Sequence, residues 1–243
     1  MYLNVNFSEY LNEFGGYFEG SVSRDGLSSV KGYDALDHAY ELIEQDNTLS
    51  LIDAITNLRR AVNLRVADIS SNIGLDNIKF QLGKNKKLER LEELGLVKPL
   101  LINKLLLLRN EIEYQGVDPP TKLICSELAD VVWYFYKSTD RYCNITPDDL
   151  LVEWEENGCE CWFTLEFDLS LHEKIKIRGE LPLEYISIDK ISSNSIELPD
   201  EIVNDSNKIR SKGSQFYFDV EIDTKQISYY KELFACALAV WGN

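Results

Sequence analysis

The first half of the chain carries apolar residues at steps of three and four positions. The longest such run, LSLIDAITNLRRAVNLRVADI at residues 49–69, is typical of an amphipathic helix with one apolar face. Ser50 is expected to cap its N-terminus. Shorter helices are predicted at residues 33–47, 86–96, 98–114 and 121–139. Gly95 and Thr121 act as a stop and a cap. This pattern predicts a helical bundle over residues 1–142.

The second half alternates apolar and polar residues instead. In LLVEWEENGCECWFTLEFDL, residues 150–169, the pair Asn157-Gly158 separates two alternating runs and predicts a β-hairpin. A turn there pairs Trp154 with Cys161 and Val152 with Phe163. Further strands are predicted at 174–178, 183–188 and 215–222, and a helix at 227–241. The expected fold class is therefore α+β, with an N-terminal helical bundle followed by an antiparallel sheet and terminal helix over residues 143–243.

Charge is distributed unevenly. The net charge of −16 argues against a general nucleic-acid binder. Residues 50–109 nevertheless hold eleven Lys and Arg against six Asp and Glu. This basic segment could face RNA, or it could pair with the protein's own acidic groups.

The N-terminal residues lack the basic and apolar regions of a signal peptide, and no run is long enough to cross a membrane. The five cysteines are odd in number and scattered, which favours reduced thiols. We therefore expect a cytoplasmic protein with no membrane partner.

Metal and nucleophilic chemistry have little support in the sequence. The two histidines, His38 and His172, fall in different predicted domains and outside any metal-ligand spacing. Cys159 and Cys161 share one face of a strand and are expected in the core. The glutamates near the hairpin turn are expected to form a solvated rim. No metal and no cofactor are predicted.

The stretch LLLLRNEIEYQG, residues 105–116, is the one segment that suggests specific chemistry. An apolar helix ends there in Arg109-Asn110, and Gly116 and Pro119-Pro120 separate it from VVWYFYKS. Residues 33–140 resemble the HEPN superfamily, helical bundles of prokaryotic defence and toxin systems whose motif is Arg-polar-x-x-x-His. In this chain Tyr114 stands where the family has histidine.

The resemblance implies candidate catalytic residues Arg109, Asn110 and Tyr114. In nucleolytic members the arginine steadies the scissile phosphate and the histidine assists proton transfer. Tyrosine, with an ordinary pKa near 10, is a poor base near neutral pH. Three interpretations remain open: Arg109 caps the helix and pairs with Glu113, a phosphate-binding pocket survives, or cleavage survives.

The predicted function is that of a catalytically silent HEPN-like binding or regulatory component of a defence or toxin-type system. The alternative is a metal-independent ribonuclease that uses Arg109, Asn110 and Tyr114. A homodimer through the helical half is expected, as is a protein partner for the acidic C-terminal module, and RNA is a possible ligand.

Overall fold

The computed structural model describes residues 1–23, 27–80, 86–115, 120–198, 203 and 209–242. The chain divides into two compact units. The helical unit comprises Ser23–Asp76 and Phe80–Ile145. The sheet unit comprises Met1–Val22, Asn77–Lys79 and Thr146–Asn243. The α+β fold class is thereby confirmed.

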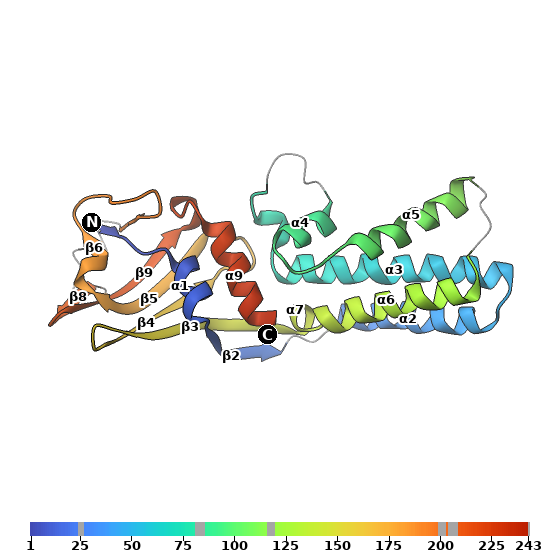
Figure 1. Cartoon of the computed structure of the whole chain (residues 1–243), viewed down its shortest axis with the longest axis horizontal. Coiled ribbons are helices and arrows are strands. Elements are labelled where there is room, and N and C mark those ends of the chain that lie inside the picture. Colours follow the sequence, from blue (N-terminus) through green and yellow to red (C-terminus); the bar gives the residue numbers. More distant parts are fainter. Residues whose placement is uncertain (24–26, 81–85, 116–119, 199–202, 204–208, 243) are drawn as a thin grey trace. The chain divides into compact units, whose positions relative to one another are not determined.

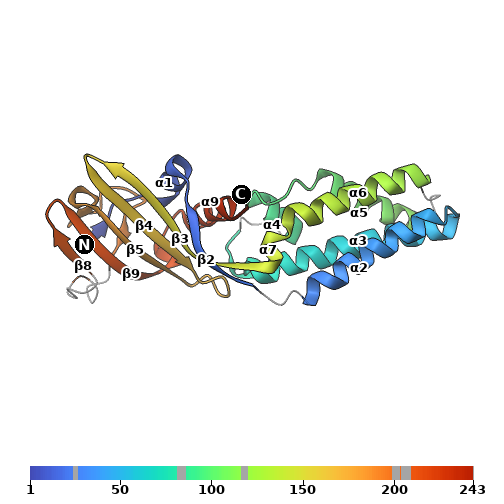
Figure 2. The same ribbon diagram turned by 90° about the horizontal axis from the view of Figure 1, so that it is seen from below.

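The helical unit is a bundle around one long helix, α3. Its helices are α2 (Leu27–Glu44), α3 (Thr48–Asn72), α4 (Lys87–Glu93), α5 (Leu100–Gln115), α6 (Lys122–Thr139) and α7 (Arg141–Asn144). A short 3-10 helix, η1 (Leu75–Asn77), follows α3. Helix α3 packs against α2, α5 and α6, and the long helices run side by side in both ribbon views (Figures 1 and 2). The predicted helices are therefore confirmed, although α2 begins six residues before the expected Tyr33.

Helix α3 begins earlier than the sequence suggested, which corrects the predicted cap. Asn47 is the N-cap, and its side chain accepts a hydrogen bond from the Ser50 backbone N–H at 3.0 Å. The Ser50 hydroxyl in turn accepts from the Asn47 backbone N–H. Ser50 is thus the third residue of the helix, the N3 position of a reciprocal capping box, and Asn47 is the cap. The other two signals hold, since Gly95 has a φ of 77° after α4 and Thr121 caps α6.

The sheet unit is built on six strands in the order β2-β3-β4-β5-β9-β8 (Figure 2). Their bounds are β2 (Tyr17–Ser23), β3 (Ile145–Glu156), β4 (Cys159–Phe167), β5 (Lys174–Pro182), β8 (Ile209–Lys212) and β9 (Gln215–Asp223). The hairpin of β3 and β4 pairs Trp154 with Cys161 and Val152 with Phe163, as predicted. Asn157 and Gly158 have φ values of 52° and 76°, which the expected type I′ turn requires.

The N-terminal segment belongs to the sheet unit, which corrects the expected 1–142 boundary of the bundle. Strand β1 (Tyr2–Leu3) pairs with β6 (Ile186–Ser187) and with β7 (Ile196–Glu197) in a small second sheet. Helix α1 (Phe7–Phe14) follows, and its Phe7 and Leu11 enter the same core as Phe163. The helical unit is therefore inserted between β2 and β3. The expected boundary between residues 142 and 143 lies three residues before the observed division after Ile145.

One face of the large sheet carries the core of this unit. The inward residues of β4, β5 and β9 are buried together with Leu233 and Ala237 of α9 (Tyr230–Gly242). Helices α1 and α9 contact each other, and the Cys236 thiol donates a hydrogen bond to the Asn12 side-chain oxygen. The first half of the predicted strand at 183–188 is instead a 3-10 helix, η2 (Leu183–Tyr185), and the two-residue β6 follows it. A third 3-10 helix, η3 (Thr224–Gln226), joins β9 to the segment before α9. No helix within the described residues is long and apolar enough to cross a membrane.

Candidate functional site

The three predicted catalytic residues, Arg109, Asn110 and Tyr114, all lie on α5. The structure describes the side chain of Asn110 alone among them. Asn110 is exposed. The side chains of Arg109 and Tyr114 lie outside the described residues. Helix α5 continues to Gln115, so Arg109 stands six residues before its end. Arg109 therefore precedes the last turn of the helix, whose carbonyls lack helical partners, and this disfavours the interpretation of Arg109 as a C-terminal cap.

Asn110 lies in a groove, which we call the α3–α5 groove, formed by α3, α4 and α5 with a volume of about 710 Å³. One wall comes from α3 and the other from α5, and residues from the start of α4 close one side. The described lining residues are Arg59, Val62, Asn63, Val66, Ala67, Lys86, Lys87, Leu88, Glu89, Asn103, Leu106, Leu107 and Asn110.

Helical periodicity explains why these side chains converge. On α3 the lining positions 59, 62 and 66 recur at steps of three and four, and on α5 positions 103, 106 and 110 do the same. Residues at this spacing lie on one face of a helix. The groove is therefore the space between two helix faces that no described residue of the bundle covers.

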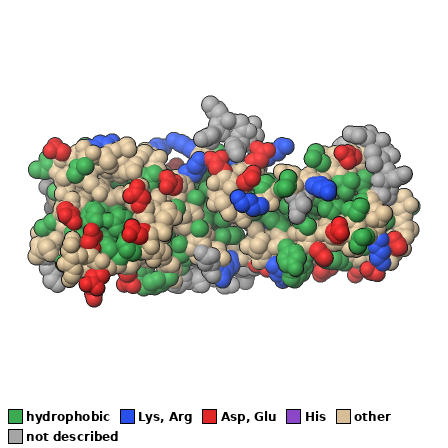
Figure 3. All heavy atoms as spheres, viewed as in Figure 1, with side chains coloured by type: hydrophobic (Ala, Val, Ile, Leu, Met, Phe, Trp, Pro, Cys, Tyr) green, Lys and Arg blue, Asp and Glu red, His purple; other side chains and the backbone are tan. Residues whose placement is uncertain are grey.

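The groove carries more positive than negative charge. Arg59, Lys86 and Lys87 line it against a single carboxylate, Glu89. Lys87 pairs with Asp76 at 2.8 Å, whereas neither Arg59 nor Lys86 forms an ion pair within the described part of the chain. In Figure 3, basic, acidic and apolar side chains occur together over the part of the helical unit that contains α4 and α5.

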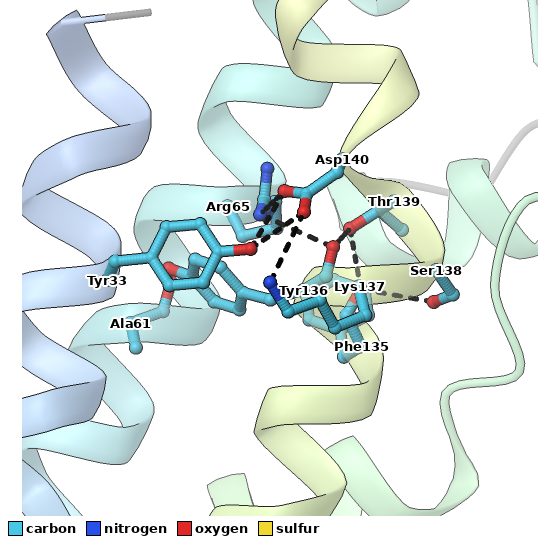
Figure 4. Close-up of polar contacts among 9 residues, drawn as sticks. All are labelled: Tyr33, Ala61, Arg65, Phe135, Tyr136, Lys137, Ser138, Thr139 and Asp140. Atoms are coloured by element: carbon cyan, nitrogen blue, oxygen red, sulfur yellow. Dashed lines mark hydrogen bonds and ion pairs between the residues drawn. The ribbon is translucent and has the colours of Figure 1, made fainter.

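A second arginine of α3 has a very different environment. Arg65 is fully buried, and its Nη2 donates to Asp140 Oδ1 at 2.5 Å and to the Tyr136 carbonyl at 3.3 Å (Figure 4). Its guanidinium lies 4.0 Å from the Tyr136 ring centroid and 5.5 Å from that of Tyr33. These distances suit cation–π contacts on two sides. The network joins α2, α3 and the end of α6.

The electrostatics of this cluster favour a permanent ion pair. Burial works to lower the pKa of Arg65, but its contacts with the Cys143 thiol and with Asp140 outweigh burial and raise that pKa. Tyr33 donates to Asp140 Oδ2 at 2.7 Å. Burial, followed by this hydrogen bond, raises the pKa of Tyr33. Burial also raises the pKa of Cys143, against the opposing effect of Arg65. Arg65 is therefore charged at every physiological pH and is held inside the bundle.

The Arg65 cluster answers part of the question raised by the basic segment. Sequence reasoning counted Arg65, Lys87 and Arg90 as possible RNA contacts, yet each pairs with an acid of the same chain. The basic segment thus combines structural cations with the exposed cations of the groove. A signal for Arg65 was present in the sequence, since the position falls on the apolar face of the predicted helix, between Val62 and Ile69.

Of the two cysteines expected in the core, Cys161 is buried, whereas Cys159 is only partly buried. Cys161 is buried opposite Trp154, and all five cysteines are free thiols. His38 is exposed near Glu41, and His172 is buried against Tyr230, with its Nδ1 2.7 Å from the tyrosine hydroxyl. Within the described residues, no group of three or more His, Cys, Asp or Glu could hold a metal ion.

The fold and the groove define a two-unit α+β protein with a groove in its helical unit whose described lining carries more positive than negative charge. Comparisons of the chain with protein-family models, with curated proteins and with solved structures give no match.

Proposed function

We propose that this protein is a catalytically silent, HEPN-like binding component of a prokaryotic defence or toxin-type system, and that its helical unit binds its ligand in the α3–α5 groove. Two points support this proposal: residues 33–140 resemble HEPN bundles, and Asn110 of the motif lines the groove. It makes the groove a recognition surface rather than a reaction centre.

The chemistry of the side chains that line the groove supports the absence of catalysis in this proposal. The described side chains that line the groove are cationic, amide or apolar, with one carboxylate, the partly exposed Glu89. None of them is a histidine, the most common general acid or base near neutral pH, and the general acid–base types among them are Glu89, Lys86 and Lys87. Cations and amides bind anionic groups well but do not by themselves remove a proton from a ribose hydroxyl.

The alternative is a ribonuclease that uses Arg109, Asn110 and Tyr114. The exposure of Asn110 in a positively charged groove is the observation that favours it, because such a groove suits phosphates. The two functions differ in whether bound RNA is cleaved.

The deciding experiment incubates the purified full chain with mixed RNA across pH 6–9, beside an Arg109→Ala variant. The proposal predicts equal, background levels of cleavage for both proteins. Cleavage by the wild-type chain that Arg109→Ala abolishes would establish the ribonuclease. A Tyr114→Phe variant then tests whether the tyrosine hydroxyl takes part.

Two assembly predictions accompany the proposed function. The helical unit is proposed to form a homodimer, in which Glu111 and Glu113 offset the charges of two Arg109 residues near one axis. The acidic C-terminal module is proposed to contact a separate protein. Sedimentation velocity at micromolar concentration tests the first of these, and a monomer would contradict it.

A further inference from the structure

The α3–α5 groove is long enough to hold one more short helix. Its α3 wall runs from Arg59 to Ala67, which corresponds to about 12 Å of helix or slightly more than two turns. The opposite wall on α5, from Asn103 to Asn110, has nearly the same length. Two ridges of side chains at one-turn spacing form the kind of groove into which a third helix packs.

The floor of the groove is apolar. Val62 is buried at its base, and Leu106 and Leu107 line it from α5. The Leu107 side chain is 62% exposed, which leaves a large apolar group in water. A ligand that covers this floor must itself offer apolar side chains at matching spacing.

The same floor is poorly suited to nucleic acid. Proteins that bind single-stranded RNA commonly stack its bases on aromatic rings. No aromatic residue belongs to the described lining of the groove, whose interior is aliphatic. Phosphates could pair with the cations, but the bases would find no stacking surface.

The rim specifies the charge of the ligand. Arg59 and Lys86 have no acidic partner within the described residues, and one carboxylate, Glu89, lies beside them. The amides of Asn63, Asn103 and Asn110 can donate hydrogen bonds to carboxylates along both walls. A ligand with acidic residues on its outer edges therefore complements the rim.

We infer that the groove binds an acidic amphipathic helix of a partner protein, about two to three turns long, with apolar residues at positions i, i+3 or i+4, and i+7. This inference rests on the proposed function, since it names the partner class for the same groove. Carboxylates beside the apolar stripe face Arg59 and Lys86, and the stripe covers Val62, Leu106 and Leu107.

The test selects ligands without assuming their sequence. A displayed library of random 16-residue peptides is selected on the immobilised full chain and counter-selected on an Arg59→Glu/Lys86→Glu variant. We expect enriched peptides to be acidic and to carry the i, i+3 or i+4, i+7 apolar pattern. A pool of random 20-nucleotide RNA is selected in parallel against the same two proteins.

Affinities of the enriched peptides are then measured by fluorescence anisotropy. Arg59→Glu/Lys86→Glu should weaken binding about tenfold or more, whereas Arg60→Glu/Lys98→Glu, which reverses two charges outside the groove, should change it less than about twofold. Leu107→Glu should also abolish binding, with Leu123→Glu as its control because Leu123 is similarly exposed on α6. Circular dichroism melting curves confirm that each variant is folded.

Three outcomes overturn the inference. Peptides that lack the acidic apolar pattern, or no enriched peptide at all, would show that the groove does not receive such a helix. Enrichment of RNA alone, lost in the charge-reversal variant, would leave the proposed binding function standing but change the ligand class. Dimers that Leu107→Glu dissociates would identify a second copy of the chain as the occupant. RNA cleavage that depends on Arg109, in contrast, would refute only the catalytic silence.

Discussion

Two arginines on the same helix show how differently one residue type is used in this protein. Arg65 and Arg59 lie six positions apart on α3. Arg65 is fully buried, pairs with Asp140 and stacks on Tyr136. Arg59 is partly exposed, faces the α3–α5 groove and has no acidic partner within the described chain. One holds three helices together, and the other is available to a ligand.

The difference teaches that charge counted along a sequence does not identify a binding surface. An arginine inside a bundle requires an acid, because an unpaired buried charge is very costly. An arginine at the rim of a groove is hydrated and needs no partner until a ligand arrives. Burial and pairing therefore separate structural cations from cations that a ligand could contact.

The largest effect is expected from removing the acid of the buried pair. Asp140→Ala leaves the Arg65 guanidinium buried without its carboxylate and should destabilise the helical unit by about 3–5 kcal/mol. Arg59→Ala is the matched control and should change the free energy of unfolding by less than about 0.5 kcal/mol. Urea denaturation measures both. Similar losses for the two variants would show that the two arginines do not differ in role.

A smaller loss is expected from crowding the ring that covers Arg65. A Cβ atom at Gly32 on α2 would lie 2.2 Å from the Tyr136 hydroxyl, which donates a hydrogen bond to the Ala61 carbonyl. Gly32→Ala must displace this ring and should cost about 1–3 kcal/mol. Thermal unfolding measures the loss. In a Tyr136→Phe background the clashing atom is absent, so the same Gly32→Ala change should cost clearly less; an undiminished cost would exclude the clash as its cause.

Alkaline pH tests the hydrogen bond from Tyr33 to Asp140. The pKa of Tyr33 is higher in the folded protein than its ordinary value, because burial and the neighbouring carboxylate disfavour the phenolate. Its contribution to stability is therefore complete below about pH 10, the unfolded pKa, and is lost as pH rises through the folded pKa. Tyr33→Phe should lower stability at pH 7 by about 1 kcal/mol and make the decline above pH 10 shallower. If stability declines equally steeply above pH 10 in Tyr33→Phe and in the wild-type chain, ionisation of Tyr33 does not cause that decline.

A similarly small effect is expected at the N-terminus of α3, the helix that carries both arginines. Asn47→Ala removes the side-chain acceptor of the capping box and should destabilise by about 1 kcal/mol. Asn57→Ala, a change of the same type on an exposed middle turn of α3, serves as the control. Chemical denaturation compares them. A larger loss at Asn57 than at Asn47 would contradict the assignment of the cap.

The sequence predicted the regular parts of the fold because local chemistry determines them. Asn157-Gly158 fixed the hairpin and its register, since positive φ at both positions leaves few alternatives. Gly95 and Thr121 marked helix ends for equally local reasons. The place of residues 1–22 was missed because the pairing of β1 with β6 and β7 joins residues almost 200 positions apart. Nothing local distinguishes such a short strand.

The site was predictable only in part. The motif on α5 directed attention to Asn110, which does line the groove. The groove itself required α3 and α4 to meet α5, and the roles of Arg59 and Lys86 depend on that packing. Likewise, no local pattern joins Arg65 to Asp140, which lies 75 residues further along the chain.

The most direct test of the account compares two adjacent arginines. Arg59 lines the groove, whereas Arg60 is exposed on α3 outside it. Binding of one selected acidic peptide is measured by fluorescence anisotropy for Arg59→Glu and Arg60→Glu in the full chain. The account predicts that Arg59→Glu weakens binding by about fivefold to tenfold and that Arg60→Glu leaves it within about twofold. Equal weakening by both variants would show that general positive charge, and not the α3–α5 groove, binds the ligand.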